Sequence, residues 1–170
     1  MAHNLEVASD GRVAFALRDK PAWHNLADTI FDKDAHVTTA DMLKAAHLAD
    51  WNVRLVPAAD IIPSEWRSNA ESHFVIRDNP FDGGIDVLSV VGSRYKALQN
   101  EDLFAFGDNI LHGGAEWETG GSIKKGRQVF GSLVIPREFT LDPSGAADKT
   151  TLYLVVSTSH DGSLAVQAMV

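Results

Sequence analysis

The chain has 170 residues, of which 45% are hydrophobic and 22% are charged, and its formal net charge is −8 at pH 7. This composition is typical of one globular domain with a sizeable core. No apolar run approaches the ~20 residues of a membrane-spanning helix, the first residues lack a secretory signal, and the absence of cysteine excludes disulfides, thiolate chemistry and cysteine-based zinc sites. We therefore expect a cytoplasmic protein without a membrane partner, and the negative charge disfavours general polyanion binding.

The first part of the chain predicts a short strand followed by an aromatic anchor. The strand is "RVAFAL", residues 12–17. In "PAWHNL", which follows, we expect Trp23 to pack an N-terminal arm onto the core and His24 to bond a nearby carbonyl.

A helix is predicted in "TTADMLKAAHLADW". Thr38, with Asp41 three residues later, is typical of a capping box. The apolar face at helical spacing comprises Met42, Ala45, Ala46 and Ala49.

Three strands are predicted next, in "NVRLVP" (52–57), "HFVIRD" (73–78) and "DVLSVVGSRYKAL" (86–98). The segment 58–72 between the first two is expected to be irregular. "NPFDGG" is turn chemistry, which predicts a hairpin joining Phe74–Arg77 to Val87–Val91.

A second helix is predicted from Asn100, a good N-cap, with Glu101 and Asp102 in the first turn, where the helix dipole favours acids. Its buried stripe is expected to be Leu103, Phe106, Gly107, Ile110 and Leu111. Three or four strands follow, in "AEWETGGSI", "RQVFGSLVIP", "TLYLVVSTS" and "SLAVQAMV".

These elements predict an α+β fold: a mostly antiparallel β-sheet with two main helices packed on it, in one domain spanning residues 1–170. The last strand has no stop signal, and its apolar face has nothing following it. Because an unpaired strand is a liability, we expect either the N-terminal part of a longer protein, incomplete at the C-terminus, or pairing with another subunit.

The stretch "GGSIKKGRQVF", residues 120–130, combines glycines with basic residues, which suggests a phosphate-binding loop. A P-loop is rejected, because Arg127 and Gln128 replace its lysine and hydroxyl and a strand pattern follows. The pattern predicts a hairpin tip in which Gly126 adopts positive φ. Lys124, Lys125 and Arg127 on that tip remain candidates for gripping a nucleic-acid backbone.

A second basic group, Arg94 and Lys96, flanks Tyr95 in "GSRYKALQN". Basic residues beside an aromatic side chain suit a single-stranded backbone with one stacked base. The same pattern also fits an exposed strand end on which Tyr95 is half-buried.

Neither metal binding nor catalysis is indicated. The seven histidines lack metal-ligand spacing. In "SHDGS", residues 159–163, Asp161 and Gly162 predict the turn of a hairpin, and this interpretation is preferred to a catalytic Ser-His-Asp relay. We expect no catalytic residue, no cofactor and no enzymatic activity, while Trp51, Trp66 and Trp117 are candidates for core or interface anchors.

Several stretches together resemble a known family, in the order "MAHNLEV", "PAWHNLADTIFD", "VVGSRYKALQNEDLFAFGDNIL", "ETGGSIKKGRQVFGSLVIP" and "YLVVSTSHDGSLAVQAMV". They are similar to the phage/plasmid-like proteins of actinobacteria and their phages, domain-of-unknown-function family 932. The resemblance implies a mobile-element protein in a bacterial host and no established activity. A more distant similarity to single-strand annealing recombinases implies a sheet against a helix, with basic residues holding single-stranded DNA.

Two hypotheses follow. In the first, the protein binds single-stranded DNA in the manner of an annealing recombinase and assembles as a homo-oligomer. Its phosphate contacts are Arg94, Lys96, Lys124, Lys125 and Arg127, with Tyr95 as a stacking partner. In the second, the protein is a non-catalytic interaction module of a mobile element that acts on a host or phage protein. The acidic balance and four tryptophans favour the second, because aromatic residues anchor interfaces.

Overall fold

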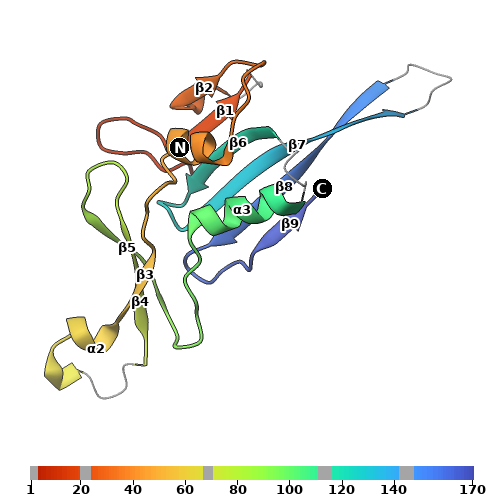
Figure 1. The fold of residues 1–170 in the computed structure, drawn as a ribbon. Coiled ribbons are helices and arrows are strands. Elements are labelled where there is room, and N and C mark those ends of the chain that lie inside the picture. Colours follow the sequence, from red (N-terminus) through yellow and green to blue (C-terminus); the bar gives the residue numbers. More distant parts are fainter. Residues whose placement is uncertain (1–3, 20–23, 67–70, 111–115, 142–147) are drawn as a thin grey trace.

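The computed structural model describes residues 4–19, 24–66, 71–110, 116–141 and 148–170. Within these ranges, nine strands form two sheets, joined by three α-helices and two 3₁₀ turns. Figure 1 shows the larger sheet with helix α3 lying across it and the smaller sheet extending to one side. The predicted α+β class, with mostly antiparallel strands, is confirmed.

The larger sheet has six strands in the order β2-β1-β6-β7-β8-β9. Their bounds are β1 (Phe15–Arg18), β2 (Thr29–Phe31), β6 (Glu116–Ile123), β7 (Gln128–Leu141), β8 (Asp148–Ser159) and β9 (Gln167–Met169). Every neighbouring pair is antiparallel except β1 with β2, which is parallel. All four strands predicted after the second helix are therefore present, and β2 is an additional strand.

The smaller sheet comprises β3 (Arg54–Pro57), β4 (His73–Asp78) and β5 (Ile85–Val91), in that order. The predicted hairpin through "NPFDGG" is confirmed, with Arg77 opposite Asp86 and Ile76 opposite Val87. A bulge shifts the register between Val75 and Ile76. In the described part of the chain, β5 pairs only with β4 and is an edge strand of this sheet.

The helices are α1 (Thr39–Ala45), α2 (Ala58–Ile61) and α3 (Asn100–Ile110), and the 3₁₀ turns are His24–Leu26 and Ser64–Trp66. The predicted capping box of α1 is confirmed, because the backbone N–H of Asp41 donates to Thr38 Oγ1 and the carboxylate of Asp41 accepts from the backbone N–H of Thr38. The expectation of an irregular segment after β3 was wrong for α2 and the second 3₁₀ turn. Ala58 is buried there, and its carbonyl accepts from the backbone N–H of Ile62, closing one helical turn.

The core between α3 and the larger sheet centres on two aromatic rings. Phe104 stacks on Trp117 with ring centroids 4.4 Å apart, and Gly131 lies so close that an added Cβ would be 2.7 Å from the indole. The predicted buried stripe was wrong at Phe106, which is 43% exposed. The stripe runs through Leu103, Phe104 and Gly107, which share a face, whereas Phe106 lies roughly 100° away from the centre of that face at 3.6 residues per turn.

The described tryptophans differ in how far their side chains are buried. Trp51 and Trp117 are buried in the core, whereas Trp66 is 69% exposed. The expected anchor Trp23 and the side chain of His24 lie outside the described residues. Of the three described tryptophans, only Trp66 therefore remains available as an interface anchor.

Candidate nucleic-acid interface

The turn between β6 and β7 carries three exposed basic side chains, Lys124, Lys125 and Arg127, which we call the cationic turn. Gly126 has φ +79°, as predicted, but Lys124 and Lys125 also have positive φ, 55° and 58°. Left-handed backbone costs a non-glycine residue about 1–2 kcal/mol, and Asn, Asp or Gly is favoured there. Two consecutive lysines in this conformation are an unfavourable choice for a turn that has only to connect two strands.

The cationic turn is fastened to neighbouring segments on both sides. The backbone N–H of Lys124 donates to the carbonyl of Asn4 at 2.8 Å, and the backbone N–H of His160 donates to the carbonyl of Arg127 at 2.7 Å. The turn is therefore held between the N-terminal segment and the loop after β8.

A buried arginine lies directly beneath the turn. Arg77, near the end of β4, is 1% exposed. A Cβ built on Gly126 would lie 2.3 Å from its Nη1 and 2.6 Å from its Cζ. No side chain fits at position 126, so glycine is required there for space as well as for backbone conformation.

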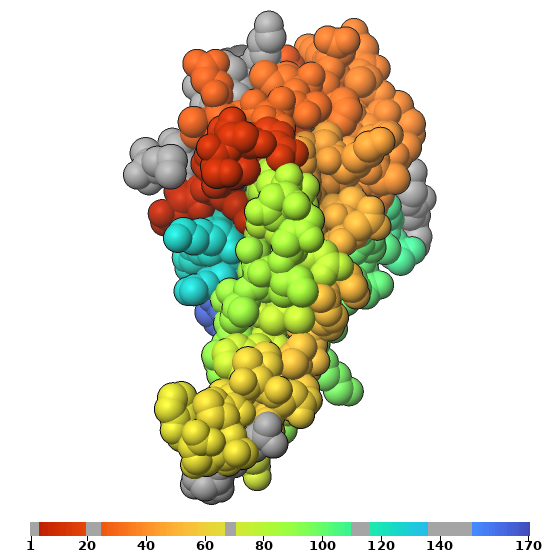
Figure 2. All heavy atoms as spheres, turned by 90° about the vertical axis from the view of Figure 1, so that its left-hand side faces the viewer, coloured from red at the N-terminus to blue at the C-terminus, as the bar shows by residue number. Residues whose placement is uncertain are grey.

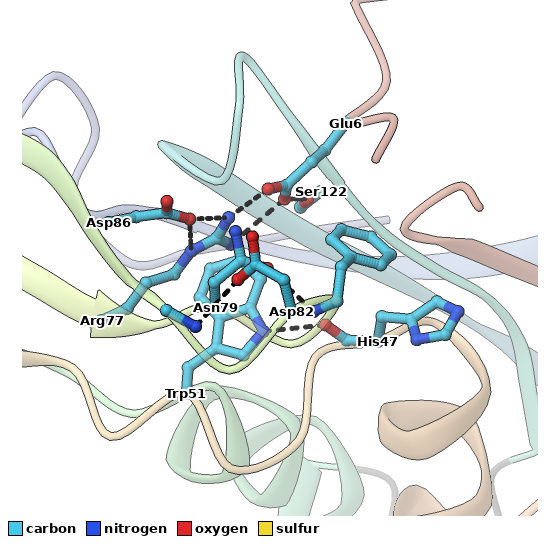
Figure 3. A network of polar contacts seen from close by, with 10 residues as sticks. Glu6, His47, Trp51, Arg77, Asn79, Asp82, Asp86 and Ser122 are labelled. Atoms are coloured by element: carbon cyan, nitrogen blue, oxygen red, sulfur yellow. Dashed lines mark hydrogen bonds and ion pairs between the residues drawn. The ribbon is translucent and has the colours of Figure 1, made fainter. Parts of the chain in front are cut away.

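Arg77 is satisfied by two carboxylates, which together with it form what we call the ion cluster (Figure 3). Its Nη1 donates to Glu6 Oε2 at 3.1 Å, and its Nη2 bonds Glu6 Oε1. Its Nε and Nη2 donate to Asp86 Oδ2 at 3.0 and 2.8 Å. Ser122 donates to Glu6, and the guanidinium lies 4.0 Å from the centre of the Trp51 ring. A buried charge needs such partners, because desolvation costs several kcal/mol.

Trp51 also lies beside a buried histidine. The rings of Trp51 and His160 lie 5.6 Å apart, and His160 Nε2 shares a 3.0 Å hydrogen bond with Asn100 Oδ1. Burial, followed by the positive charge of Arg77, lowers the pKa of His160 to about 4, so the ring is neutral at pH 7.

The "SHDGS" stretch therefore forms a turn with one inward-facing ring. His160 points to Asn100, while Asp161 accepts from the backbone N–H of Ser163 at 2.9 Å. Gly162 has φ +73°, and β8 pairs antiparallel with β9 after it, as the hairpin signal predicted.

The cationic turn and the ion cluster meet in a surface hollow of about 260 Å³, which we call the β5 hollow. Its lining includes Glu6, Arg77, Asp86, Val87, Lys125 and Arg127. Figure 2 shows the turn, in cyan, beside the strands of the smaller sheet, in green. The hollow thus holds three cations and two carboxylates, and both carboxylates are already bonded to Arg77.

The second predicted group, Arg94, Tyr95 and Lys96, lies in the loop after β5. Arg94 and Lys96 are exposed, and Arg94 and Tyr95 help to line a separate hollow of about 330 Å³. Tyr95 is half-buried, as one alternative expected, and its hydroxyl donates to the carbonyl of Ser159 at 3.2 Å. Burial, and then the charge of Asp161, raise the pKa of Tyr95.

The two basic groups lie at opposite ends of β5. Lys125 and Arg127 share a hollow with Asp86 and Val87 at its start, whereas Arg94 follows its end. The side chain of Tyr95 nevertheless reaches toward the turn, because its hydroxyl bonds the carbonyl of Ser159, and the next residue, His160, bonds the carbonyl of Arg127. The structure therefore brings Lys124, Lys125 and Arg127 together and places Arg94, Tyr95 and Lys96 in a second group.

Asp161 lies between the two groups. Although burial raises its pKa, hydrogen bonds from Ser163 and Ser159 and the charge of Lys124 lower it overall. The same carboxylate acts on Tyr95. The charge of one carboxylate therefore interacts with both basic segments.

Sequence reasoning missed the ion cluster. The hairpin register predicted from "NPFDGG" places Arg77 close to Asp86, and opposite charges facing across strands are a recognised stabilising pair. Glu6 lies 71 residues from Arg77 in the sequence and had no local signal.

The fold and this surface define an α+β protein with an exposed cationic turn above a buried arginine that is bonded to two carboxylates. Residues 87–170 match the family model Domain of unknown function (DUF932), which supports the resemblance for that part of the chain. No match was found among the curated proteins or among the solved structures. The matched range contains β5 from Val87 onward, both basic groups and His160, whereas Glu6, Arg77 and Asp86 precede it.

Among the described residues, no group of three or more His, Asp or Glu side chains is placed to hold a metal ion. None of the helices in the described ranges is long and apolar enough to cross a membrane.

Proposed function

We propose that this chain is a non-catalytic protein that binds single-stranded nucleic acid, with Lys124, Lys125 and Arg127 contacting the phosphates. The observation that carries the proposal is the left-handed conformation of Lys124 and Lys125 on an exposed turn. Backbone strain that persists in a fold concentrates at functional sites. Because asparagine or glycine would relieve this strain, the lysines are best explained by the charges they display.

The surroundings of the turn favour binding. Its backbone is already fixed by Asn4 and His160, so little ordering entropy is lost when a ligand binds. Glu6 and Asp86 are bonded to Arg77, which reduces their competition for Lys125 and Arg127. Phosphate contacts therefore remain available on a protein whose net charge is negative.

The order of elements also agrees with an annealing function. Helix α3 is followed by β6, β7 and β8, which are antiparallel neighbours, and α3 contacts β7 and β8. This is the order that the resemblance to annealing recombinases implies. Annealing requires no bond-making chemistry, only a surface that holds the backbone. We place this activity in a phage- or plasmid-encoded protein that acts as a homo-oligomer.

The proposal is tested by fluorescence anisotropy with a labelled oligothymidylate at several salt concentrations. The variant Lys125→Gln with Arg127→Gln removes two cations. We expect at least about tenfold weaker binding and a log–log salt slope shallower by about 1.4, since each single-strand phosphate contact contributes about 0.7.

The matched control is Lys33→Gln with Lys44→Gln, which removes the same charge from two exposed positions in and just before α1. It should retain the wild-type slope. Undetectable binding of the wild-type protein at low salt, or equal weakening in both double variants, would show that the turn is not a phosphate site.

A second candidate function, a protein-interaction module, is favoured by a different surface. Trp66 is 69% exposed and Ile61 is 57% exposed, both in the segment after β3. Exposed tryptophans are enriched among interface anchors. A stoichiometric host protein that co-purifies with the wild-type chain but not with Trp66→Ala, with nucleic-acid affinity unchanged, would select this function.

A further inference from the structure

One face of β5 displays three largely exposed apolar side chains, two of which lie opposite Phe74 and Ile76 of β4. Ile85, Val87 and Val90 are 65%, 58% and 56% exposed, whereas Leu88 between them is 2% exposed. Exposed apolar residues are common singly, but three on one edge strand of a small sheet form a continuous strip.

One member of this strip, Val87, lines the β5 hollow together with Lys125 and Arg127. The strip ends just before the exposed side chains of Arg94 and Lys96. Figure 2 shows β4 and β5, in green, running along the molecule next to the cyan turn. Apolar side chains therefore lie along β5 between the two basic groups.

We propose that Ile85, Val87 and Val90 are the base-contacting half of the site, and this inference rests on the proposed binding of single-stranded nucleic acid. The cations at both ends of the strip favour an extended polyanion. The exposed apolar side chains between them can pack against the flat, partly apolar faces of nucleic-acid bases. A single strand offers both, since its bases are not stacked in a duplex and thymine adds a methyl group. An apolar peptide would not account for the basic residues at both ends, and a second copy of the chain is distinguished by sedimentation below.

The inference is tested by comparing oligothymidylate with an abasic oligonucleotide of the same length, which has the same phosphates and no bases. For the wild-type protein we expect about fivefold tighter binding of oligothymidylate, the gain from burying roughly 40 Å² of apolar surface at about 25 cal/mol per Å². The variant Ile85→Thr, Val87→Thr and Val90→Thr keeps β-branched side chains, which suit a strand. This variant should bind the two oligonucleotides with affinities within about twofold of each other, close to the affinity of the wild-type protein for the abasic oligonucleotide.

Ile61→Thr is the matched control, since Ile61 is 57% exposed and lies in α2, outside β5. It should preserve the wild-type preference for bases. Equal, salt-dependent binding of both oligonucleotides by the wild-type protein would overturn the base contacts and leave the phosphate contacts standing. No binding of either would overturn both.

Sedimentation of the same proteins gives an independent readout. If the wild-type chain forms a dimer that the triple threonine variant loses, the strip is a protein interface and the inference is wrong. An unchanged mass, together with a lost preference for bases, supports it.

Discussion

Arg77 and Arg127 line the same hollow, yet the protein uses their charges in opposite ways. Arg77 is 1% exposed and is bonded to two carboxylates, whereas Arg127 is exposed on the turn above it. A buried guanidinium needs carboxylate partners within the folded protein. An exposed guanidinium needs no such partner and is available to a ligand. The comparison teaches that the internal ion cluster supports the external cationic turn.

The largest expected effect comes from Arg77→Met, which leaves Glu6 and Asp86 without their partner. Removing one member of a buried ion pair costs about 3–5 kcal/mol, and we expect a loss of that size in the free energy of unfolding, measured by urea titration. Arg54→Met is the control, because Arg54 and Asp78 form a partly exposed pair at 2.8 Å. It should cost at most about 1 kcal/mol. Similar small losses in both variants would show that Arg77 is not a structural charge.

Gly126→Ala tests the contact between the two regions. The new Cβ would overlap the guanidinium of Arg77 while φ remains at +79°, so we expect a loss of about 3 kcal/mol, from overpacking added to backbone strain. At Gly83, φ is +71° and the position of an added Cβ is open. Gly83→Ala should therefore cost only about 1 kcal/mol. Equal losses would mean that the turn does not rest on Arg77.

The pH dependence of stability probes His160, the buried histidine beside Trp51. In the unfolded chain its pKa is the usual 6.5, whereas in the folded chain burial lowers the pKa to about 4. Stability is therefore unaffected by His160 above about pH 6.5 and falls as the pH drops toward 4, by about 2 kcal/mol at pH 5. His160→Gln, which keeps a donor for Asn100, should lack this part of the loss in urea titrations at pH 7 and pH 5. Identical pH slopes in the two proteins would contradict a neutral, buried ring.

The smallest effect is expected at the turn itself, with the opposite sign. Lys125→Asn places a residue that tolerates left-handed backbone at φ 58° and should stabilise the fold by about 0.5 kcal/mol. The same change should weaken binding of oligothymidylate, because it removes one cation. A variant that is no more stable than the wild type would show that the lysine carries no strain.

Local patterns predicted what depends on neighbouring residues. The capping box of Thr38 and Asp41, the β4–β5 hairpin and the positive φ of Gly126 were all confirmed, since each is decided within a few residues. Strand β2 and helix α2 were missed, because β2 has three residues and depends on β1, and α2 is a single turn.

The site was predictable only in part, for the same reason. The sequence identified the cationic turn, but lysine has no preference for the left-handed conformation that Lys124 and Lys125 adopt. The exposure of Val87 beside the turn depends on how the two sheets meet. Such contacts join residues that no local rule connects.

The way in which the ion cluster is assembled also bears on how the protein is made. During translation, Glu6 and Arg77 emerge well before Ser122 and Gly126, which complete their surroundings. A nascent chain that has reached only the end of β5 carries both charges without the serine that bonds the glutamate or the glycine that covers the arginine. The cluster therefore acquires its complete surroundings only after residue 126 has left the ribosome.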